Sequence, residues 1–581
     1  MNHELLREAL ADPALIQSFS GVRASFGDGP GISKGHSAIA NAYGYAYARR
    51  SLAGWGNATL VIGRDPRPTG QAVSFGLARG FLAGAKAIGA RLRLVDMGII
   101  TTPLLQTAVR VLKAAGGVMI TASHNPLSDN GFKFLTGHQV SSASHDEAPA
   151  GALLSADRMT DLVSDARRMA EAGGDPLLDE IAALSDGIVM RAMGRPGDER
   201  LRIRAERAYL DFLGHEWGVE PHCLKPLTLG PALLDPNGGS ASGIGARVLE
   251  HFGVRTTETN ARLGRPEHPI DTDGVDPRTG KHMLLRVALS ACEAGARFGV
   301  AFDYDADRGN LVLPGTDGSA IIAPQAVAAL SVALALAHRH TARRARGRTA
   351  VVVSEATSGA SVDVATLFGA TAFVVETGEI NVVTRMRRLR DEGYEVPIGV
   401  EGANGGAIFG KSTCRDGLQT ALCAALADES PDITSDWMRA LSSGCEQPNH
   451  VGSVRLPDLL ALVPRYCNRM LRFETAGRPH GEVKARMESY FADIAWPDLS
   501  GTYGSYEFVD YEGTGRVERR TGDESGGWRV ELKAGDEGDF IFARGSRTEA
   551  GVWRLIVDSP DEARYQALER AALAMFETAA A

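Results

Sequence analysis

The stretch TLVIGRDPRPTGQAVSFGLARGFLAGAKAIGARLRLVDMG, residues 59–98, indicates the fold of the chain. Its apolar runs predict a strand over 59–65, a helix over 74–87 and a second strand over 91–98. A further helix over 104–115 and a further strand follow in the same order. Strand-helix alternation of this kind predicts a mostly parallel sheet covered by helices.

The alternation recurs twice, starting near residues 227 and 349, and gives way to shorter strands with turn signals after about residue 445. We therefore expect an α/β protein with three similar mixed-sheet α/β domains and a smaller C-terminal α+β domain around a central cleft. The segment 141–200 is rich in Ala, Ser, Asp and Gly and is interpreted as an insertion of helices and loop. The predicted domains cover 1–204, 205–316, 317–444 and 445–581.

Composition argues against partners that are bound by bulk positive charge. The chain has 581 residues, and its 62 basic against 71 acidic side chains give a net charge of −9. This balance favours neither nucleic acid nor a membrane surface as a partner. The six cysteines form no C-x-x-C pair and are thinly spread, as in a reduced cytosolic protein. We expect a cytoplasmic location.

Two segments bear on membrane association. The N-terminus is charged and amphipathic and lacks the apolar stretch of a secretion signal. The longest apolar run, Ala320 to Ala337, approaches the length of a membrane span, yet it carries Pro324, Gln325 and Ser331 and is mostly alanine. A buried helix is the favoured interpretation of this run.

The sequence VMITASHNPLSDNGFKF, residues 118–134, places Ser123, His124 and Lys133 on a loop between two apolar strands. A serine in this position can be a nucleophile if a base or an electropositive site activates it, although a turn serine is the simpler alternative. His124 points away from Ser123 in an extended segment, so a hydrolase-type dyad is not implied. Lys133 lies on the returning strand and can face the same cleft.

The sequence FDYDADRGN spaces Asp303, Asp305 and Asp307 at alternate positions before Arg308. If the loop curls, the three carboxylates can converge on one hard divalent cation and leave a position for a phosphate oxygen. The alternative is a solvated acidic strand end. Because the segment follows an apolar strand, the loop lies at the edge of the sheet where α/β proteins bind ligands, which favours a metal site.

Two further loops carry polar groups that suit a sugar phosphate. VEGANGGAIF places Glu401 and Asn404 in a glycine-rich turn, where a carboxylate and a carboxamide can bind vicinal hydroxyls. FARGSRTEAGVWR gathers guanidinium groups and hydroxyls that suit a phosphate dianion. The residues concerned in this last loop are Arg544, Ser546, Arg547 and Thr548. Each loop alone is also compatible with an ordinary turn.

Taken together, the four loops resemble those of the α-D-phosphohexomutase family, which includes phosphoglucomutases, phosphomannomutases, phosphoglucosamine mutases and phosphoacetylglucosamine mutases. T-x-S-H-N-P with N-G-F-K matches 121–126 and 130–133, and D-x-D-x-D-R matches 303–308. Supporting matches are SGVR at 20–23, GRDPRPTG at 63–70, TTP at 101–103, LDPNGG at 234–239 and TGEINVV at 377–383.

The other two loops depart from the family pattern. The usual sugar loop is G-E-x-S-G, whereas Glu401 is followed here by Gly402-Ala403-Asn404. The A-N-G that ends at residue 405 is similar to the sugar loop of phosphoacetylglucosamine mutases, with one residue inserted. In the phosphate loop, R-x-S-G-T-E-P in the family, Arg547 replaces the glycine and Ala550 the proline.

The resemblance implies a role for each candidate residue. Phosphorylated Ser123 would exchange a phosphoryl group with a sugar phosphate through a bisphosphorylated intermediate, with a sugar 1,6-bisphosphate as activator. The aspartate triplet would hold Mg²⁺ against that phosphoserine. Lys133, Arg23 and His124 would serve proton transfer and phosphoryl stabilisation. The implied substrate ligands are Arg308, Glu401, Asn404, Arg544, Ser546, Arg547 and Thr548.

The expected function is therefore a phosphohexomutase that moves a phosphoryl group between positions 1 and 6 of a glucose or mannose phosphate. The enzyme alternatives are a phosphoglucosamine or phosphoacetylglucosamine mutase and a phosphatase. The alternative of another class is a non-catalytic sugar-phosphate binding protein. The sequence leaves the sugar, the pathway and the oligomeric state open.

Overall fold

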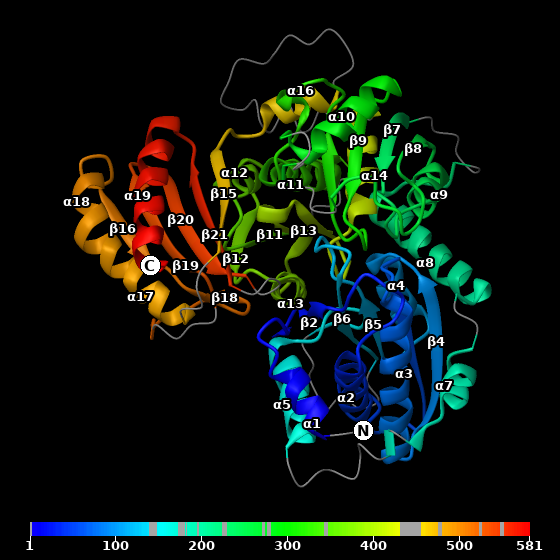
Figure 1. The fold of residues 1–581 in the computed structure, drawn as a ribbon. Helices are drawn as coiled ribbons and strands as arrows, with labels where there is room; N and C mark the ends of the chain where they lie inside the picture. Colours follow the sequence, from blue (N-terminus) through cyan, green and yellow to red (C-terminus); the bar gives the residue numbers. More distant parts are fainter. Residues whose placement is uncertain are drawn as a thin grey trace. The chain divides into compact units, whose positions relative to one another are not determined.

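We describe the protein from a computed structural model of residues 1–581 (Figure 1). Its contacts divide the chain into two compact units, Met1–Ile321 with Ser412–Leu422, and Ile322–Lys411 with Cys423–Ala581. The residues that the structure describes are 3–138, 148–171, 180–181, 183–194, 197–222, 229–269, 274–275, 280–341, 347–429, 455–474, 479–521, 526–546 and 551–580.

The first unit begins with a six-stranded sheet in the order β1-β2-β6-β5-β3-β4. Strands β5, β3 and β4 pair in parallel, whereas the pairings from β5 through β6 and β2 to β1 are antiparallel. The strands are β1 Ile16–Ser18, β2 Gly21–Ser25, β3 Asn57–Arg64, β4 Arg91–Ile99, β5 Gly116–Ile120 and β6 Asp129–Thr136. The sheet is thus mixed rather than mostly parallel, because the short loop between β5 and β6 closes a hairpin.

Helices cover this sheet and account for most of its core. The core cluster joins side chains of α2 and α3 to β3, β5 and β6, while α4 packs against β3 and β5. The helices are α1 His3–Leu10, α2 Lys34–Ser51, α3 Gly70–Ala87, α4 Thr102–Val111, α5 Ala156–Ala170, α7 Asp186–Met193 and α8 Glu199–Trp217. The α4 helix ends four residues before the predicted limit, and Lys113 there adopts a φ of 50°.

A four-stranded sheet in the order β10-β9-β7-β8 completes the sheets of the first unit. Strands β7, β8 and β9 are parallel, and β10 returns antiparallel to β9. The elements are β7 Leu229–Asp235, α9 Ile244–His251, β8 Val254–Glu258, α10 Met283–Glu293, β9 Phe298–Phe302, β10 Gly309–Val312 and the 3₁₀ turn η1 Gly318–Ala320. The β9-β10 turn therefore lies at the carboxyl edge of a buried parallel strand.

The second unit contains a similar sheet in the order β12-β11-β13-β14, with β14 antiparallel to β13. Its elements are α11 Pro324–Thr341, β11 Thr349–Ser354, α12 Gly359–Leu367, β12 Thr371–Val375, α13 Glu379–Asp391, β13 Glu395–Glu401, η2 Gly402–Asn404 and β14 Gly406–Phe409. α14 Gly417–Glu429 follows this sheet in sequence. The long apolar run is confirmed as a buried helix, α11. Within the described ranges, no helix has the length and apolar character needed to cross a bilayer.

The last sheet is five-stranded and antiparallel, in the order β15-β21-β20-β19-β16. Its core packs against α17 and α19, which Figure 1 shows beside the orange and red strands. The strands are β15 Cys467–Glu474, β16 Ser505–Phe508, β17 Tyr511–Glu512, β18 Gly515–Arg516, β19 Trp528–Ala534, β20 Glu537–Gly545 and β21 Val552–Ser559. The helices are α16 Leu456–Leu462, α17 His480–Tyr490, the π-helical η3 Phe491–Ala495, α18 Trp496–Leu499 and α19 Glu562–Ala580.

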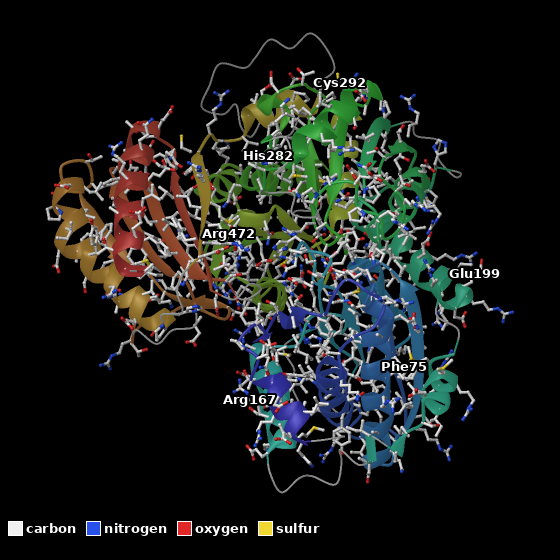
Figure 2. All side chains as sticks on the ribbon, viewed as in Figure 1. Phe75, Arg167, Glu199, His282, Cys292 and Arg472 are labelled. Carbon is white, nitrogen blue, oxygen red and sulfur yellow. The ribbon has the colours of Figure 1, made fainter. Side chains whose placement is uncertain are left out.

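These sheets and helices confirm the mixed α/β architecture expected from the sequence, while the four domain boundaries stay a prediction. The four cysteines in the described part of the chain are free thiols. Cys292 is the exposed one and is labelled on α10 in Figure 2.

Candidate functional site

Ser123 lies on the β5-β6 hairpin in a backbone conformation that a network of buried groups enforces. Its φ is 54°, in the left-handed region that residues other than glycine seldom adopt. Its amide donates to Thr121 Oγ1 at 2.8 Å, and Thr121 Oγ1 in turn donates to Asp65 Oδ2 at 2.6 Å. The loop is therefore held in one shape before any ligand arrives.

Arg67 is the side chain that binds this loop most extensively. Its Nη2 donates to the carbonyl oxygens of Ser123 at 2.8 Å and Asn125 at 2.7 Å. Its Nη1 donates to the carbonyls of Pro126 and, at 2.8 Å, Asp129. Asp65 pairs with Arg67 Nε at 3.1 Å and so offsets the buried charge. One planar guanidinium thus fixes the whole β5-β6 loop, from Ser123 to Asp129.

The three aspartates of the β9-β10 turn converge, as expected for a curled loop. Asp303, Asp305 and Asp307 are fully buried, and one oxygen from each lies within 4.8 Å of the others. Ala306, with a φ of 59°, makes the turn between them. The backbone amide of Thr102 donates to the carbonyl of Asp305 at 2.9 Å, and its Oγ1 donates to Asp305 Oδ2 at 2.6 Å.

The structure brings the predicted nucleophile and lysine onto this triplet. Ser123 Oγ donates to Asp303 Oδ2 at 2.7 Å. Lys133 Nζ pairs with Asp305 Oδ2 at 3.1 Å and with Asp307 Oδ2 at 3.3 Å. Residues separated by more than 160 positions in sequence therefore share one buried centre, which the motif order alone could suggest but not demonstrate.

Arg308 and Arg23 add positive charge to the same centre. Arg308 donates from Nε to Asp303 Oδ2 and from its backbone amide to Asp303 Oδ1, each at 3.1 Å. Arg23 lies on β2 opposite Gly131, and burial lowers the pKa of its guanidinium to about 10 despite the attraction of Asp305 and Asp307. His124 follows Ser123 and is partly buried, and its predicted role stays a prediction.

The aspartates of the triplet differ in pKa, because burial and the neighbouring charges act on them unequally. Burial, with repulsion from Asp307 and Asp305, raises the pKa of Asp303 to about 7. Burial also opposes ionisation of Asp307, but Arg415, Lys133 and Arg308 outweigh it and hold the pKa of Asp307 below its ordinary value. Burial lowers the pKa of Lys133, yet Asp305 and Asp307 raise it by more.

The donor set fits a hard divalent cation. The Oδ1 atoms of Asp305 and Asp307 are buried, and neither finds a hydrogen-bond partner within the described ranges. A buried carboxylate oxygen left without a partner costs free energy, which a bound cation would recover. Three carboxylates converging within a few ångströms match the oxygen ligands that Mg²⁺ or Ca²⁺ takes. The triplet could therefore hold a metal ion.

Sequence reasoning missed a further arginine at this centre. Arg415 Nη2 lies 2.6 Å from Asp307 Oδ2, and its side chain is 15% exposed. No local pattern marks it, because it comes from the segment before α14, more than a hundred residues from its partner. Arg67 and Thr102 lie in stretches matched to the family, GRDPRPTG and TTP, but no role was predicted for either side chain.

In the second unit, the predicted sugar loop follows β13. Glu401 ends this strand and is 3% exposed. Asn404 Oδ1 accepts the amide hydrogen of Gly406 at 2.9 Å, the bond of a turn-forming asparagine. Gly402 donates from its amide to Thr357 Oγ1 at 3.0 Å, which anchors the start of the loop. The carboxamide oxygen of Asn404 is thus already used by the backbone.

The predicted phosphate loop is described only in part. Arg544 Nη1 donates to the carbonyl of Thr377 at 2.8 Å, within the TGEINVV segment. Ser546 Oγ accepts from Arg554 Nη1 at 2.8 Å. Arg547 and Thr548 lie outside the described residues.

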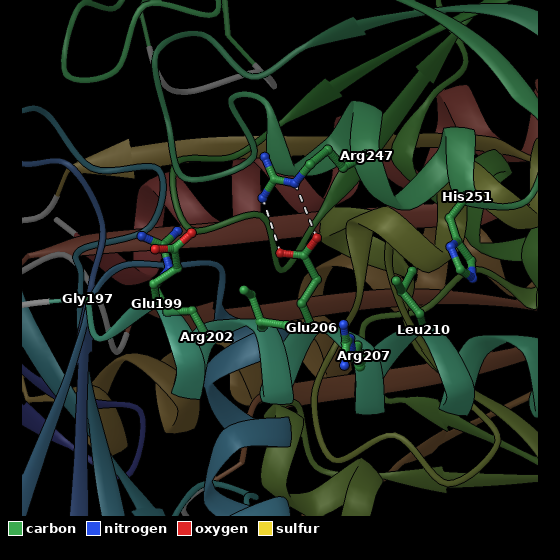
Figure 3. A pocket seen from close by; sticks show the side chains of 9 residues that line it. Gly197, Glu199, Arg202, Glu206, Arg207, Leu210, Arg247 and His251 are labelled. Carbon is green, nitrogen blue, oxygen red and sulfur yellow. Dashed lines mark hydrogen bonds and ion pairs between the residues drawn. The ribbon is translucent and has the colours of Figure 1, made fainter.

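A separate surface pocket of about 730 Å³ lies in the first unit (Figure 3). Arg247 bridges it through bonds from Nε and Nη2 to the two carboxylate oxygens of Glu206, each at 3.2 Å. The lining residues are Gly197, Glu199, Arg202, Ile203, Glu206, Arg207, Leu210, Arg247 and His251. None of these residues belongs to the buried centre, and none was predicted as a site residue.

Two segments of the chain match models of a known family. The model of phosphoglucomutase/phosphomannomutase alpha/beta/alpha domain I matches residues 16–150, and that of domain III matches residues 330–441. Over these two segments the chain is similar to the phosphoglucomutase/phosphomannomutase family, in line with the resemblance of its motifs. Members of this family are phosphomutases, which are intramolecular phosphotransferases.

Curated relatives are phosphoglucosamine mutases at low identity. One from Nocardia farcinica is 27% identical over 63% of this chain and 70% of its own length. One from Mycobacterium marinum is 30% identical over 50% of this chain and 56% of its own length. Other relatives are matched over about half their length, such as that from Rhodococcus jostii at 46%.

Solved structures share the fold. A phosphoglucomutase/phosphomannomutase family protein from Burkholderia thailandensis has a TM-score of 0.63 at 17% identity and covers 97% of both chains. Parafusin, a phosphoglucomutase from Paramecium in its open form, has a TM-score of 0.61 at 15% identity and covers 98% of this chain and 95% of its own. At these identities the likeness concerns the fold.

The Arg67 network predicts a stability effect. Arg67→Lys keeps one charge but removes the planar fork, leaving buried carbonyls of the loop without a donor. We expect the free energy of unfolding to fall by about 3 kcal/mol, the usual cost of breaking a buried charged network. Urea denaturation measures this, and amide hydrogen exchange over residues 121–130 should accelerate. Arg50→Lys, on an exposed ion pair with Asp161, is the matched control and should change stability by less than about 1 kcal/mol.

The triplet predicts metal binding. Asp305→Asn should raise the dissociation constant for Mn²⁺ by at least about tenfold, because a neutral amide is a weaker ligand than a carboxylate. Isothermal titration calorimetry on the metal-free protein measures it. Asp317→Asn, at an exposed turn in the same unit, is the control. Equal Mn²⁺ affinity in the wild type and the Asp305 variant would remove the triplet as the site.

Proposed function

We propose that the protein is a phosphohexomutase that moves a phosphoryl group between positions 1 and 6 of a hexose phosphate through a phosphoserine at Ser123. The contact between Ser123 Oγ and Asp303 Oδ2, at 2.7 Å, is the observation that carries this proposal. Through this contact Ser123, the candidate nucleophile of the 121–126 motif, touches the aspartate triplet of the 303–308 motif. A protein that only binds sugar phosphates would not need a serine there.

The chemistry follows from the groups around Ser123. In the forward step the bond from phosphorus to Ser123 Oγ breaks while a bond forms to the oxygen of a free sugar hydroxyl. The proton of that hydroxyl passes to a general base, for which Lys133 is the predicted residue. The return step transfers the other phosphoryl group of the bisphosphorylated sugar to Ser123, so the enzyme ends as it began.

The cationic side chains would stabilise the charge on the transferring group. Lys133 and Arg308 each lie within 3.3 Å of a triplet oxygen and so close to the serine that carries the phosphoryl group. Mg²⁺ bound by the triplet would supply further charge neutralisation during transfer. With a cation bound, Asp305 and Asp307 would raise the pKa of Lys133 less, which brings Lys133 nearer to a proton-transfer role.

The sugar is the finer part of the proposal. A glucose or mannose phosphate is the substrate expected from the sequence. Phosphoglucosamine mutase is the second candidate, favoured by the names of the curated relatives. A sugar 1,6-bisphosphate would act as activator by phosphorylating Ser123. The roles of Glu401, Asn404, Arg544 and Ser546 as substrate ligands stay predictions.

Ser123→Ala tests the nucleophile. It should lower turnover by at least about 10³-fold, because no other hydroxyl replaces a covalent nucleophile. Phosphorus NMR of glucose, mannose, glucosamine and N-acetylglucosamine 1-phosphates with Mg²⁺ and a trace of bisphosphate measures it. Ser128→Ala, in the same loop, should remain active. A phosphopeptide mapped to a residue other than Ser123 would contradict the assignment, and free phosphate as the product would indicate a phosphatase.

Asn404 can be tested for a role in sugar choice. Because its Oδ1 already accepts from Gly406, we expect Asn404→Asp, which keeps an acceptor and loses the amide donor, to preserve the ratios of kcat/KM among the four sugar phosphates within about threefold. Asn404→Ser, whose shorter side chain reaches less far, should instead lower kcat/KM for all four together. A selective loss for the acetylated sugar in the aspartate variant would show that the amide contacts the acetamido group.

A further inference from the structure

Tyr304 lies between two members of the aspartate triplet and reaches toward the loop that carries Ser123. It occupies the β9-β10 turn between Asp303 and Asp305 and is 1% exposed. The Cζ atom of Arg67 lies over its ring, 5.4 Å from the ring centroid. A guanidinium within about 6 Å of a tyrosine face is attracted by that face, and more strongly when both groups are buried. Tyr304 therefore joins the turn to the guanidinium that fixes the β5-β6 loop.

The backbone of Tyr304 is held from the other side. Its carbonyl accepts the amide hydrogen of Ser240 at 2.9 Å, in the segment between β7 and α9. A Cβ on Gly239 would lie 2.9 Å from that carbonyl oxygen and 3.0 Å from the Cα atom of Tyr304, so the two backbones pack directly against each other. Because its backbone is anchored beside the four-stranded sheet and its ring contacts Arg67, which follows β3, Tyr304 links the two sheets of the first unit.

The hydroxyl group of Tyr304 takes no part in this link. Its oxygen is buried and has no hydrogen-bond partner among the residues that the structure describes. Tyr304→Phe would therefore keep the contact with Arg67, whereas Tyr304→Leu or Tyr304→Met would fill much of the space without an aromatic face. The ring and the hydroxyl can thus be tested separately.

A contact that spares the reacting atoms matters, because the hydrogen bond between Ser123 and Asp303 cannot last through the proposed reaction. Ser123 Oγ donates its hydrogen to Asp303 Oδ2, and a phosphoserine has no hydrogen there to donate. The contact between Tyr304 and Arg67 uses no atom of the serine, of the triplet carboxylates or of a phosphoryl group. It can therefore hold the β5-β6 loop against the turn both before and after transfer.

We propose that Tyr304 is a positioning residue, which acts through Arg67 to keep Ser123 in register with the aspartate triplet when the serine is phosphorylated. When the triplet holds a cation, the turn is more rigid, and the ring transmits this constraint to Arg67 and to the loop carbonyls that Arg67 binds. Tyr304 touches no reacting atom and exchanges no proton. Keeping register during transfer rests on the proposed mutase function, whereas the link between cation and loop can be measured without any sugar.

The link is tested by amide hydrogen exchange over residues 121–130, with and without saturating Mn²⁺, in a Ser123→Ala background. Ser123→Ala lacks the hydrogen bond to Asp303, as a phosphoserine does, and keeps the Tyr304 contact. We expect Mn²⁺ to slow exchange at least about threefold in this background. Adding Tyr304→Leu or Tyr304→Met should remove most of that slowing, and adding Tyr304→Phe should keep it. Calorimetric Mn²⁺ affinity should change by less than about threefold, because all three carboxylates remain.

Turnover with Ser123 intact tests the positioning role. With the sugar 1-phosphate that the wild type converts, Tyr304→Leu should lower kcat by about tenfold while KM changes by less than about twofold, because the groups that bind substrate are untouched. Tyr304→Phe should match the wild type. Phe81→Leu removes a fully buried ring from α3 in the same unit and is the matched control. It should lose stability without losing either kcat or the effect of Mn²⁺ on exchange.

Three results would overturn the proposal. No slowing by Mn²⁺ in Ser123→Ala, or full slowing after both Tyr304→Leu and Tyr304→Met are added, would show that the ring does not link the cation to the loop. An equal loss in Tyr304→Phe would assign the effect to the hydroxyl, and an equal loss in Phe81→Leu would reduce it to packing. If the wild type converts no sugar phosphate while the slowing still depends on the ring, the mutase function fails and the link stands.

Discussion

The burial of three aspartates within one turn is the constraint on which the first unit depends. Carboxylates this close repel one another and lose hydration, so each needs positive charge or hydrogen bonds nearby. The structure supplies them from β6 through Lys133, from the β9-β10 turn itself through Arg308 and from the segment before α14 through Arg415. Charge balance at one point therefore joins three segments that are distant in sequence.

At the neighbouring β5-β6 loop, the buried side chain of Arg67 provides hydrogen-bond donors for backbone carbonyls. The β5-β6 hairpin buries several backbone carbonyls, and Arg67 donates to four of them with a single group. Asp65 in turn neutralises Arg67 and accepts from Thr121. The left-handed backbone at Ser123 is thereby stabilised by contacts on both sides. Because the loop conformation is fixed in this way, the Ser123 hydroxyl is held in position without a rearrangement of the loop.

The local parts of this arrangement could be predicted from the sequence, whereas the connections between them could not. Alternate aspartates after an apolar strand indicate a metal loop because the ligands are neighbours in the chain. The contacts of Arg67 and Arg415 depend on how distant segments pack, and neither residue stands in a spacing that implies a partner. At Asn404 the sequence allowed both a sugar ligand and a turn residue; the structure shows the turn hydrogen bond, and the sugar contact stays a prediction. Mixed sheets were expected, but the place where the first sheet turns antiparallel is set by the β5-β6 hairpin, which strand-helix alternation does not reveal.

If Ser123 is the phosphorylated residue, as proposed, its hydrogen bond to Asp303 would link phosphorylation to cation binding. Phosphorylation removes the hydroxyl hydrogen that Ser123 Oγ donates to Asp303 and places new negative charge beside that carboxylate. Asp303 then loses a favourable contact and gains a repulsive one, which only added positive charge can offset. A cation in the triplet would supply that charge, so phosphorylation of Ser123 would strengthen cation binding. By thermodynamic reciprocity, the cation must favour the phosphorylated serine by the same factor. The two motifs, which lie far apart in the sequence, would then operate as one unit.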